Sequence, residues 1–276
     1  MSFRDILVCV DDSDFAAGRM RVAAELASRF KAELTGVFVE PPLPNPAIGG
    51  EFGGYVPPTI IDEMVRDHRK RVEGAADVAF SRFETAAAEV TATSEPMVVA
   101  KASSGGFFAA ARCYDLVVCG AKGVGDGAIE GLSAADVVLG CGGPVLLAPD
   151  IVVSPTVGRR IIVAWNGTRE SARALRDAWP LLSEAEAVMV VVAGGADAGA
   201  EPLLQRHFER HGHQVEVLVD RSGVPAEEVI RIQAEGFDAD LVVMGLYGHS
   251  RFKEFVLGGV SRSMLAQRSL PLFVSH

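Results

Sequence analysis

The fold is indicated most clearly by one segment near the end of the chain, Asp240-Leu-Val-Val-Met-Gly-Leu-Tyr-Gly-His-Ser-Arg-Phe-Lys-Glu-Phe-Val-Leu-Gly-Gly-Val-Ser261. Its apolar run, residues 241–244, is typical of a buried parallel strand. Glycines follow at once at 245 and 248, and again at 258 and 259. Proteins of the α/β class hold phosphate groups at such strand–loop–helix junctions, because glycine lets the backbone approach the anion and free N–H groups face it.

The same kind of strand occurs near the start of the chain. Residues 115–123, Asp-Leu-Val-Val-Cys-Gly-Ala-Lys-Gly, match residues 240–248, Asp-Leu-Val-Val-Met-Gly-Leu-Tyr-Gly, at an offset of 125. This match aligns Gly120 and Gly123 with Gly245 and Gly248. A repeated strand with its glycines indicates two copies of one structural unit.

A second pair of segments supports the repeat. Residues 6–13, Ile-Leu-Val-Cys-Val-Asp-Asp-Ser, match residues 161–168, Ile-Ile-Val-Ala-Trp-Asn-Gly-Thr, at an offset of 155. Asp11 thereby aligns with Asn166. Each copy alternates strands and helices, which predicts two tandem α/β domains with mostly parallel sheets, at 1–149 and 156–276.

Local patterns place the main helices. The side chains of Asp11, Asp12 and Ser13 are of the types that cap a helix, here one over 15–30. Further helices are expected over 60–90 and 170–182. Residues 41–58 contain six prolines and four glycines. They are either a lid over a site or a disordered surface insertion.

Composition excludes several classes of protein. The chain has 276 residues and a net charge of −10, which disfavours a general nucleic-acid or anionic-membrane surface. No apolar stretch approaches the roughly 20 residues that span a bilayer. The chain begins directly with a strand pattern rather than a signal peptide, so a cytoplasmic location is expected.

The four cysteines give no sign of a metal or disulfide site. They contain no Cys-x2-Cys pair, and Cys9 and Cys119 lie within apolar strand patterns. They are interpreted as small buried hydrophobes in a reducing compartment.

At Gly245-x2-Gly248-x9-Gly258 the sequence resembles the universal stress proteins, whose nucleotide signature is Gly-x2-Gly-x9-Gly-Ser/Thr. Gly259 stands where that family has Ser or Thr, and Ser261 follows two positions later. The resemblance implies two five-stranded, Rossmann-like domains of the adenine-nucleotide α-hydrolase type, arranged as a pseudo-dimer. It also implies a stress-response role and a ligand that is ATP or another adenine nucleotide, with or without Mg.

The resemblance also implies the site residues. In the second copy they are Asn166, Val192, Ala193, Gly245, Gly248, His249, Gly258, Gly259, Val260 and Ser261; in the first they are Asp11, Val39, Gly120 and Gly123. His249 could touch a phosphate or only decorate the surface. The first copy has Ser133 at the third glycine and Asp136 opposite Ser261, and a carboxylate there would repel phosphate. The second copy is therefore expected to be the main nucleotide site.

A histidine cluster is the other feature that could carry chemistry. His207 and His211 are four residues apart, so one helix face could present both to a metal, with His213 close behind. A solvated helix end is the other interpretation, and no metal site is assigned.

Neither a Walker lysine nor a nucleophile elbow is present, and no catalytic residue is assigned. The sequence therefore predicts a nucleotide-dependent binding module. Two alternatives stay open: a slow ATPase or self-phosphorylating enzyme, and an interaction module that has lost nucleotide binding. Pairing of two tandem chains into a homodimer also stays open.

Overall fold

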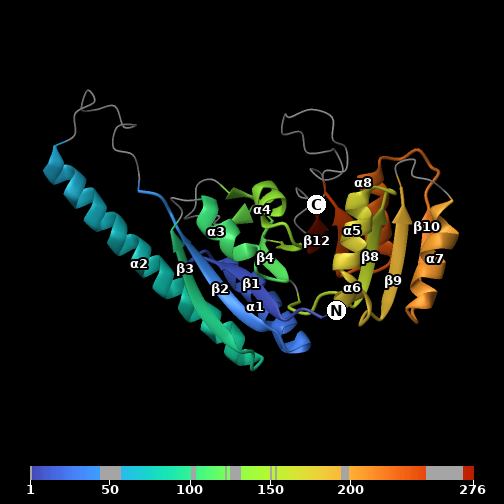
Figure 1. Ribbon diagram of the computed structural model, residues 1–276, viewed down its shortest axis with the longest axis horizontal. Coiled ribbons are helices and arrows are strands. Elements are labelled where there is room, and N and C mark those ends of the chain that lie inside the picture. Colours follow the sequence, from blue (N-terminus) through green and yellow to red (C-terminus); the bar gives the residue numbers. More distant parts are fainter. Residues whose placement is uncertain are drawn as a thin grey trace.

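The computed structural model describes residues 2–43, 57–100, 104–121, 123–124, 132–149, 151–152, 154–193, 199–246 and 270–276. Within these ranges the chain forms one continuous twisted sheet with helices on both faces (Figure 1). None of the helices in the described ranges is long and apolar enough to cross a membrane.

The sheet has the strand order β10-β9-β8-β11-β12-β7-β4-β1-β2-β3, with a small hairpin, β5 and β6, attached to β4. Neighbouring strands along this order are parallel, except that β12 and β7 are antiparallel. The strands are β1 Asp5–Val10, β2 Glu33–Glu40, β3 Ser94–Ala100, β4 Leu116–Gly120, β5 Gly123–Val124, β6 Leu132–Ser133, β7 Val145–Ala148, β8 Arg160–Trp165, β9 Ala187–Val192, β10 Glu216–Val219, β11 Leu241–Gly245 and β12 Leu272–Ser275.

The antiparallel contact between β7 and β12 joins two equivalent halves. Each half is a parallel sheet of five strands, ordered 3-2-1-4-5 by its own numbering, so the predicted tandem α/β fold is confirmed. Two aspartates show the equivalence in atomic detail. Asp115 accepts the backbone N–H groups of Arg4 and Asp5, and Asp240 accepts those of Arg159 and Arg160. The carboxylate that precedes the fourth strand thus ties down the start of the first strand in both halves.

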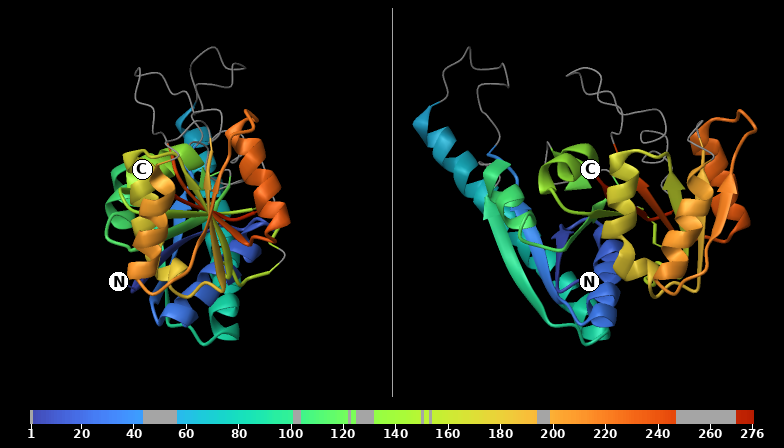
Figure 2. Two further views of the ribbon diagram at one scale, coloured as in Figure 1. Left: turned by 90° about the vertical axis from the view of Figure 1, so that its right-hand side faces the viewer. Right: turned by 45° about the vertical axis from the view of Figure 1, so that its right-hand side comes forward.

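The helices divide between the two faces of the sheet (Figures 1 and 2). One buried cluster holds residues of α1, α2, α5, α6 and α7, and a second holds residues of α3, α4 and α8. The helices are α1 Ala16–Phe30, α2 Pro58–Glu89, α3 Ser104–Ala111, α4 Ala134–Cys141, α5 Arg169–Asp177, α6 Trp179–Leu182, α7 Ala200–Arg210 and α8 Ala226–Gly236.

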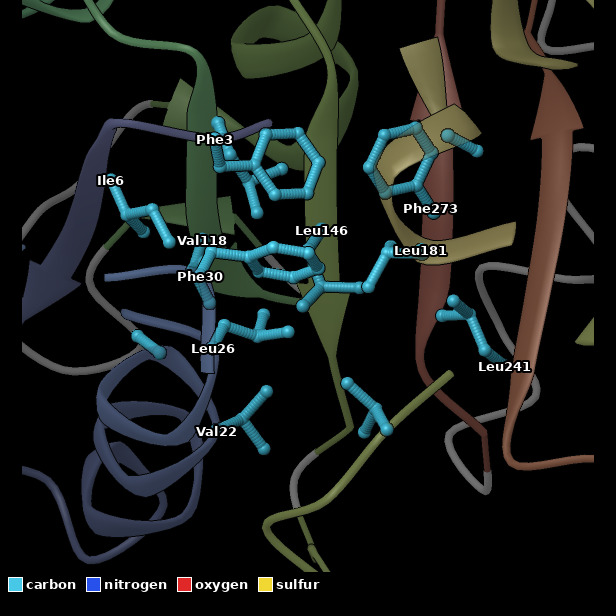
Figure 3. Close-up of a cluster of buried hydrophobic side chains, with 14 of the residues drawn as sticks. Phe3, Ile6, Val22, Leu26, Phe30, Val118, Leu146, Leu181, Leu241 and Phe273 are labelled. Carbon is cyan, nitrogen blue, oxygen red and sulfur yellow. The ribbon is translucent and has the colours of Figure 1, made fainter. Parts of the chain in front are cut away.

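The hydrophobic core runs through the junction between the halves. The ring of Phe3 meets the ring of Phe30 edge-on at 5.2 Å and lies 6.4 Å from the ring of Phe273 in β12. Leu146 and Leu181 belong to the same buried cluster (Figure 3). Because aromatic side chains of both halves share one core, the two repeats form an intramolecular pseudo-dimer rather than two independent domains joined by a linker.

Several local expectations were wrong. Helix α1 begins at Ala16 without a side-chain cap, because Asp11 turns back to accept the N–H of Ser13. The helix expected over 170–182 divides at Ala178 into α5 and α6, since Pro180 has no N–H to continue the ladder.

Strand β3 starts at Ser94 and includes Pro96, which an edge strand tolerates. The hairpin of β5 and β6 was not predicted. Of the segment 41–58, residues 44–56 lie outside the described residues.

Candidate functional site

The predicted residues that the structure describes gather at two equivalent places. In each half the first and fourth strands are neighbours, and this is where the connections diverge to opposite faces. Asp11 and Gly120 lie at the carboxyl ends of β1 and β4. Asn166 and Gly245 lie at the carboxyl ends of β8 and β11. Open parallel sheets bind ligands at such a switch point.

In the first half the key carboxylate is already occupied. Asp11 is 1% exposed, and its Oδ2 accepts a hydrogen bond from the guanidinium of Arg19, which is 3% exposed. Its Oδ1 accepts the N–H of Ser13 at 2.9 Å. Arg19 in turn donates through Nε to the carbonyl oxygen of Cys9 at 2.6 Å. Both oxygens of Asp11 are thus used inside the protein, as a buried ion requires.

Arg19 was missed from the sequence, although the repeat contained a signal. At the offset of 155 that aligns Asp11 with Asn166, Arg19 aligns with Ala174 in α5. Both members of the ion pair are therefore replaced together by uncharged residues in the second half. The exchange removes one negative and one positive charge at the same location, as a coupled pair demands.

The described glycines of the first half's loop also pair within the protein. Gly123 pairs with both Gly120 and Ser133 in the small hairpin. Ser133 caps α4 by accepting the N–H of Asp136 at 3.2 Å, and Asp136 accepts the N–H of Ser133 at 2.9 Å. This capping box places a carboxylate at the helix start where a phosphate would bind.

The second half presents a different group at its carboxyl edge. Asn166 is exposed, and its Oδ1 accepts the N–H of Thr168 at 3.2 Å and the hydroxyl of Thr168 at 2.8 Å. Gly167, with φ of +75°, makes this tight turn possible. A backbone N–H can only donate, so the oxygen of Asn166 must face it, and the amide N–H groups face outward.

Gly245 has a packing role in addition to its place in the glycine motif. A Cβ at this position would lie 2.5 Å from the backbone nitrogen of Ser171 and 2.7 Å from the carbonyl oxygen of Glu170. The first turn of α5 therefore rests directly on the end of β11. Burial raises the pKa of Glu170, but hydrogen bonds from Arg169, from its own backbone and from Thr168 outweigh this and lower it overall. Glu170 is thus held as an anion at the start of α5.

The ends of the second strands contribute backbone rather than side chains. Val39, Val192 and Ala193 are 1%, 1% and 5% exposed, so their side chains belong to the core. The carbonyl oxygen of Val192 already accepts the N–H of Asp220 at 2.9 Å. The remaining predicted residues lie outside the described residues: Gly248, His249, Gly258, Gly259, Val260 and Ser261.

The histidine cluster surrounds a tryptophan. The rings of His207, His211 and His213 lie 5.5, 4.4 and 5.9 Å from the Trp179 ring. Nδ1 of His211 lies 2.8 Å from the carbonyl oxygen of His207. Among the residues that the structure describes, no group of three His, Cys, Asp or Glu side chains is placed to hold a metal. The arrangement is a cluster of edge-on and tilted rings around Trp179 of α6.

The cysteines are free thiols. Cys9, Cys119 and Cys141 are buried, as expected for the two in strands, whereas Cys113 is exposed, contrary to expectation. Burial raises the pKa of the Cys9 and Cys119 thiols well above the usual range and that of Cys141 to about 12. These three are therefore poor nucleophiles.

Comparison with known proteins gives consistent results. The universal stress protein family matches residues 2–149 and 158–276. Over 71 residues the chain is 30% identical to the universal stress protein MJ0577 of Methanocaldococcus jannaschii, which covers 26% of this chain and 43% of that protein. The chain thus spans under half the length of this curated relative.

Two solved structures resemble the whole chain. A universal stress protein from Archaeoglobus fulgidus has a TM-score of 0.72 at 17% identity, covering 98% of this chain and 97% of that one. A functionally unknown protein from Pseudomonas aeruginosa has a TM-score of 0.56 at 16% identity, covering 99% and 92%. At these identities the likeness concerns the fold. The family match to both halves and the sheet of two repeats together show that the chain belongs to the universal stress protein family, as a tandem member.

Proposed function

We propose that this protein is a cytoplasmic regulatory binding protein that holds one adenine nucleotide per chain, at the carboxyl edge of its second half. Membership of the universal stress protein family supports the ligand class. The observation that carries the proposal is the asymmetry between the halves: Asp11 is buried against Arg19, whereas Asn166 is exposed at the equivalent position.

The first half fills its own site. Its carboxylate is neutralised by Arg19, and the start of α4 is capped by Asp136. A nucleotide entering there would have to displace a buried ion pair and then approach a carboxylate with its phosphates. Both steps cost free energy in the first half. Binding beside the uncharged Asn166 in the second half does not carry these costs.

The chemistry of Asn166 suggests which ligand atoms it would meet. Its oxygen is taken by Thr168, so the outward-facing group is the amide N–H donor pair. Donors suit acceptor atoms such as adenine ring nitrogens or ribose oxygens. The uncharged amide also avoids the repulsion that a carboxylate would add next to a polyphosphate. Mg, where it accompanies the nucleotide, would be held mainly by phosphate oxygens.

Titration calorimetry with ATP, ADP and AMP tests the proposal. We expect a stoichiometry of one nucleotide per chain. Asn166→Asp keeps the oxygen that Thr168 needs but removes the donors, so affinity should fall about five- to tenfold, the usual worth of one hydrogen bond. Asp12→Asn changes the equivalent turn of the first half. It is the matched control and should bind nucleotide like the parent.

Three results would overturn the proposal. Absence of binding at millimolar nucleotide would favour the interaction-module alternative. Two equivalent nucleotides per chain would show that the ion pair and the capping box do not close the first half. Phosphate release that depends on the second half would instead move the protein to the ATPase alternative.

A further inference from the structure

Helix α2 is far longer than the sheet surface that it covers. It has 32 residues, but its fully buried side chains are Ala79, Phe83, Ala86 and Ala87, all in its last third. Figures 1 and 2 show the N-terminal part of this helix running beyond the edge of the sheet. In proteins most of the stability of a helix comes from packing of its amphipathic face rather than from helix propensity, so a projecting helix is normally supported by packing on another surface.

The projecting part continues the apolar stripe of the packed part. At 3.6 residues per turn, Ile61, Val65, His68 and Val72 lie on the same face as Ala79 and Phe83. Val72 packs partly against the core, and Nε2 of His68 lies 3.1 Å from the carbonyl oxygen of Pro41. Farther out, Ile61 is 37% and Val65 42% exposed. The stripe thus changes from buried to half-buried to exposed toward the N-terminus of α2.

Charge along the projecting part is balanced and ordered. Between residues 58 and 76 there are four acidic and four basic side chains. The acidic pair Asp62 and Glu63 comes first, and the basic run 69–71 comes later. A segment that is negative at one end and positive at the other complements an antiparallel copy of itself.

We propose that the projecting parts of α2 from two chains pack antiparallel and make this protein a homodimer. With a two-fold axis between residues 66 and 67, Ile61 lies over Val72 of the partner subunit, and Val65 lies over His68 of the partner subunit. Each exposed stripe residue thereby covers a position that its own chain leaves half-buried.

The same register matches charges at the flank of the stripe. In an antiparallel helix pair, the residue directly after a stripe residue on one helix lies opposite a residue that directly follows a stripe residue on the other helix. Asp62 follows Ile61 and Arg69 follows His68, so Asp62 faces Arg69 of the partner subunit, twice by symmetry. On the other flank Met64 faces Arg71 of the partner subunit, whose aliphatic stem can cover the thioether. A parallel pair would instead bring both globular bodies to the same end of the helices.

This proposal concerns association and does not depend on nucleotide binding. It is tested by sedimentation of nucleotide-free protein from low micromolar to near-millimolar chain concentration. The parent should shift with concentration from one chain to two. Asp62→Arg and Arg69→Asp each replace two attractive pairs by two repulsive ones, so each should weaken association on the order of tenfold or more.

Mixing the two variants is the decisive step. Each heterodimer between Asp62→Arg and Arg69→Asp chains regains opposite charges at both flank positions, so a one-to-one mixture should dimerise although neither variant does alone. The matched control is Asp67→Arg, on the opposite side of α2, which should dimerise like the parent. Circular dichroism should show that all variants are folded, since every changed residue is on the surface.

Three outcomes would overturn the proposal. The parent could remain a single chain at every concentration. The dimer could persist equally in Asp62→Arg and Asp67→Arg, which would place the contact elsewhere, for example at the edge strand β3. Or the mixture of variants could fail to associate, which would exclude the antiparallel register.

Discussion

The buried pair of Asp11 and Arg19 can be tested by converting the first half into the second. The second half carries Asn166 and Ala174 at the equivalent positions. The three variants are therefore Asp11→Asn, Arg19→Ala and the double variant, all within one double-mutant cycle. Asp12→Asn, an exposed neighbour of Asp11, is the control for a nearby loss of charge.

The structure sets the expected magnitudes. Either single change leaves one charge buried without its partner, which typically costs about 3–5 kcal/mol. The double variant leaves no buried charge. It loses the hydrogen bond from Arg19 to the carbonyl of Cys9 and opens a cavity, which together cost about 1–3 kcal/mol. The two single effects should therefore exceed the double effect, with a coupling energy on the order of 3 kcal/mol.

Urea denaturation provides the assay. Circular dichroism follows the whole chain, while tryptophan fluorescence follows the second half, where both tryptophans, Trp165 and Trp179, are located. Because the core is continuous across β7 and β12, both signals should shift together. The reasoning is refuted if Asp11→Asn costs less than about 1 kcal/mol, or if the single effects simply add to give the double effect.

Three further predictions concern packing and pH. Gly245→Ala forces a Cβ to 2.5 Å from the nitrogen of Ser171, so the urea midpoint should fall by the equivalent of about 1–3 kcal/mol even without nucleotide. Burial raises the pKa of Glu25, so the folded state binds this proton more tightly than the unfolded state, and stability falls as pH rises through that pKa. Glu25→Gln should therefore stabilise the protein at neutral pH. Thermal melts should show that this gain vanishes in acid. Burial, and then the neighbouring His211, lower the pKa of His207, so stability should decline as pH falls through the ordinary histidine pKa of about 6.5, and His207→Asn should flatten that decline.

Much of the fold was predictable because the two copies of the repeat share apolar strand patterns that are visible in the sequence. The apolar runs ending at Gly120 and Gly245 were found from sequence, and the structure places both at the same point of equivalent half-sheets. Local signals of this kind depend on a few neighbouring residues. The break at Ala178 was missed because the periodic pattern of apolar residues continued through Pro180, although proline withholds the N–H that the helix needs.

The site was less predictable because its decisive contacts are between residues of different elements. Asp11 looked like a helix cap or a ligand contact, since both roles suit a carboxylate after a strand. Its actual partner is Arg19 in α1, eight residues later in the chain, which had been given no role from the sequence. A buried arginine in a helix that packs on a sheet is a warning that some acidic group must meet it. That inference needs the face of the helix, which only the fold supplies.

The repeat itself is the best control for such assignments. If Asp11 were kept for a ligand, the second half could exchange Asp for Asn without any change in the helix that follows. Instead the exchange of Asp11 for Asn166 comes with the exchange of Arg19 for Ala174, and the exposed side chain is the uncharged one. The two positions differ together between the halves, and they are in contact in the half where both are charged. Their pairing is therefore explained by packing and electrostatics without a ligand. The glycine at 245 follows the same logic, since the backbone of α5 excludes a side chain there whatever the loop beyond it binds. The nucleotide therefore has to be sought at groups that the fold leaves unused, and in the described part of the second half the outward amide of Asn166 is such a group.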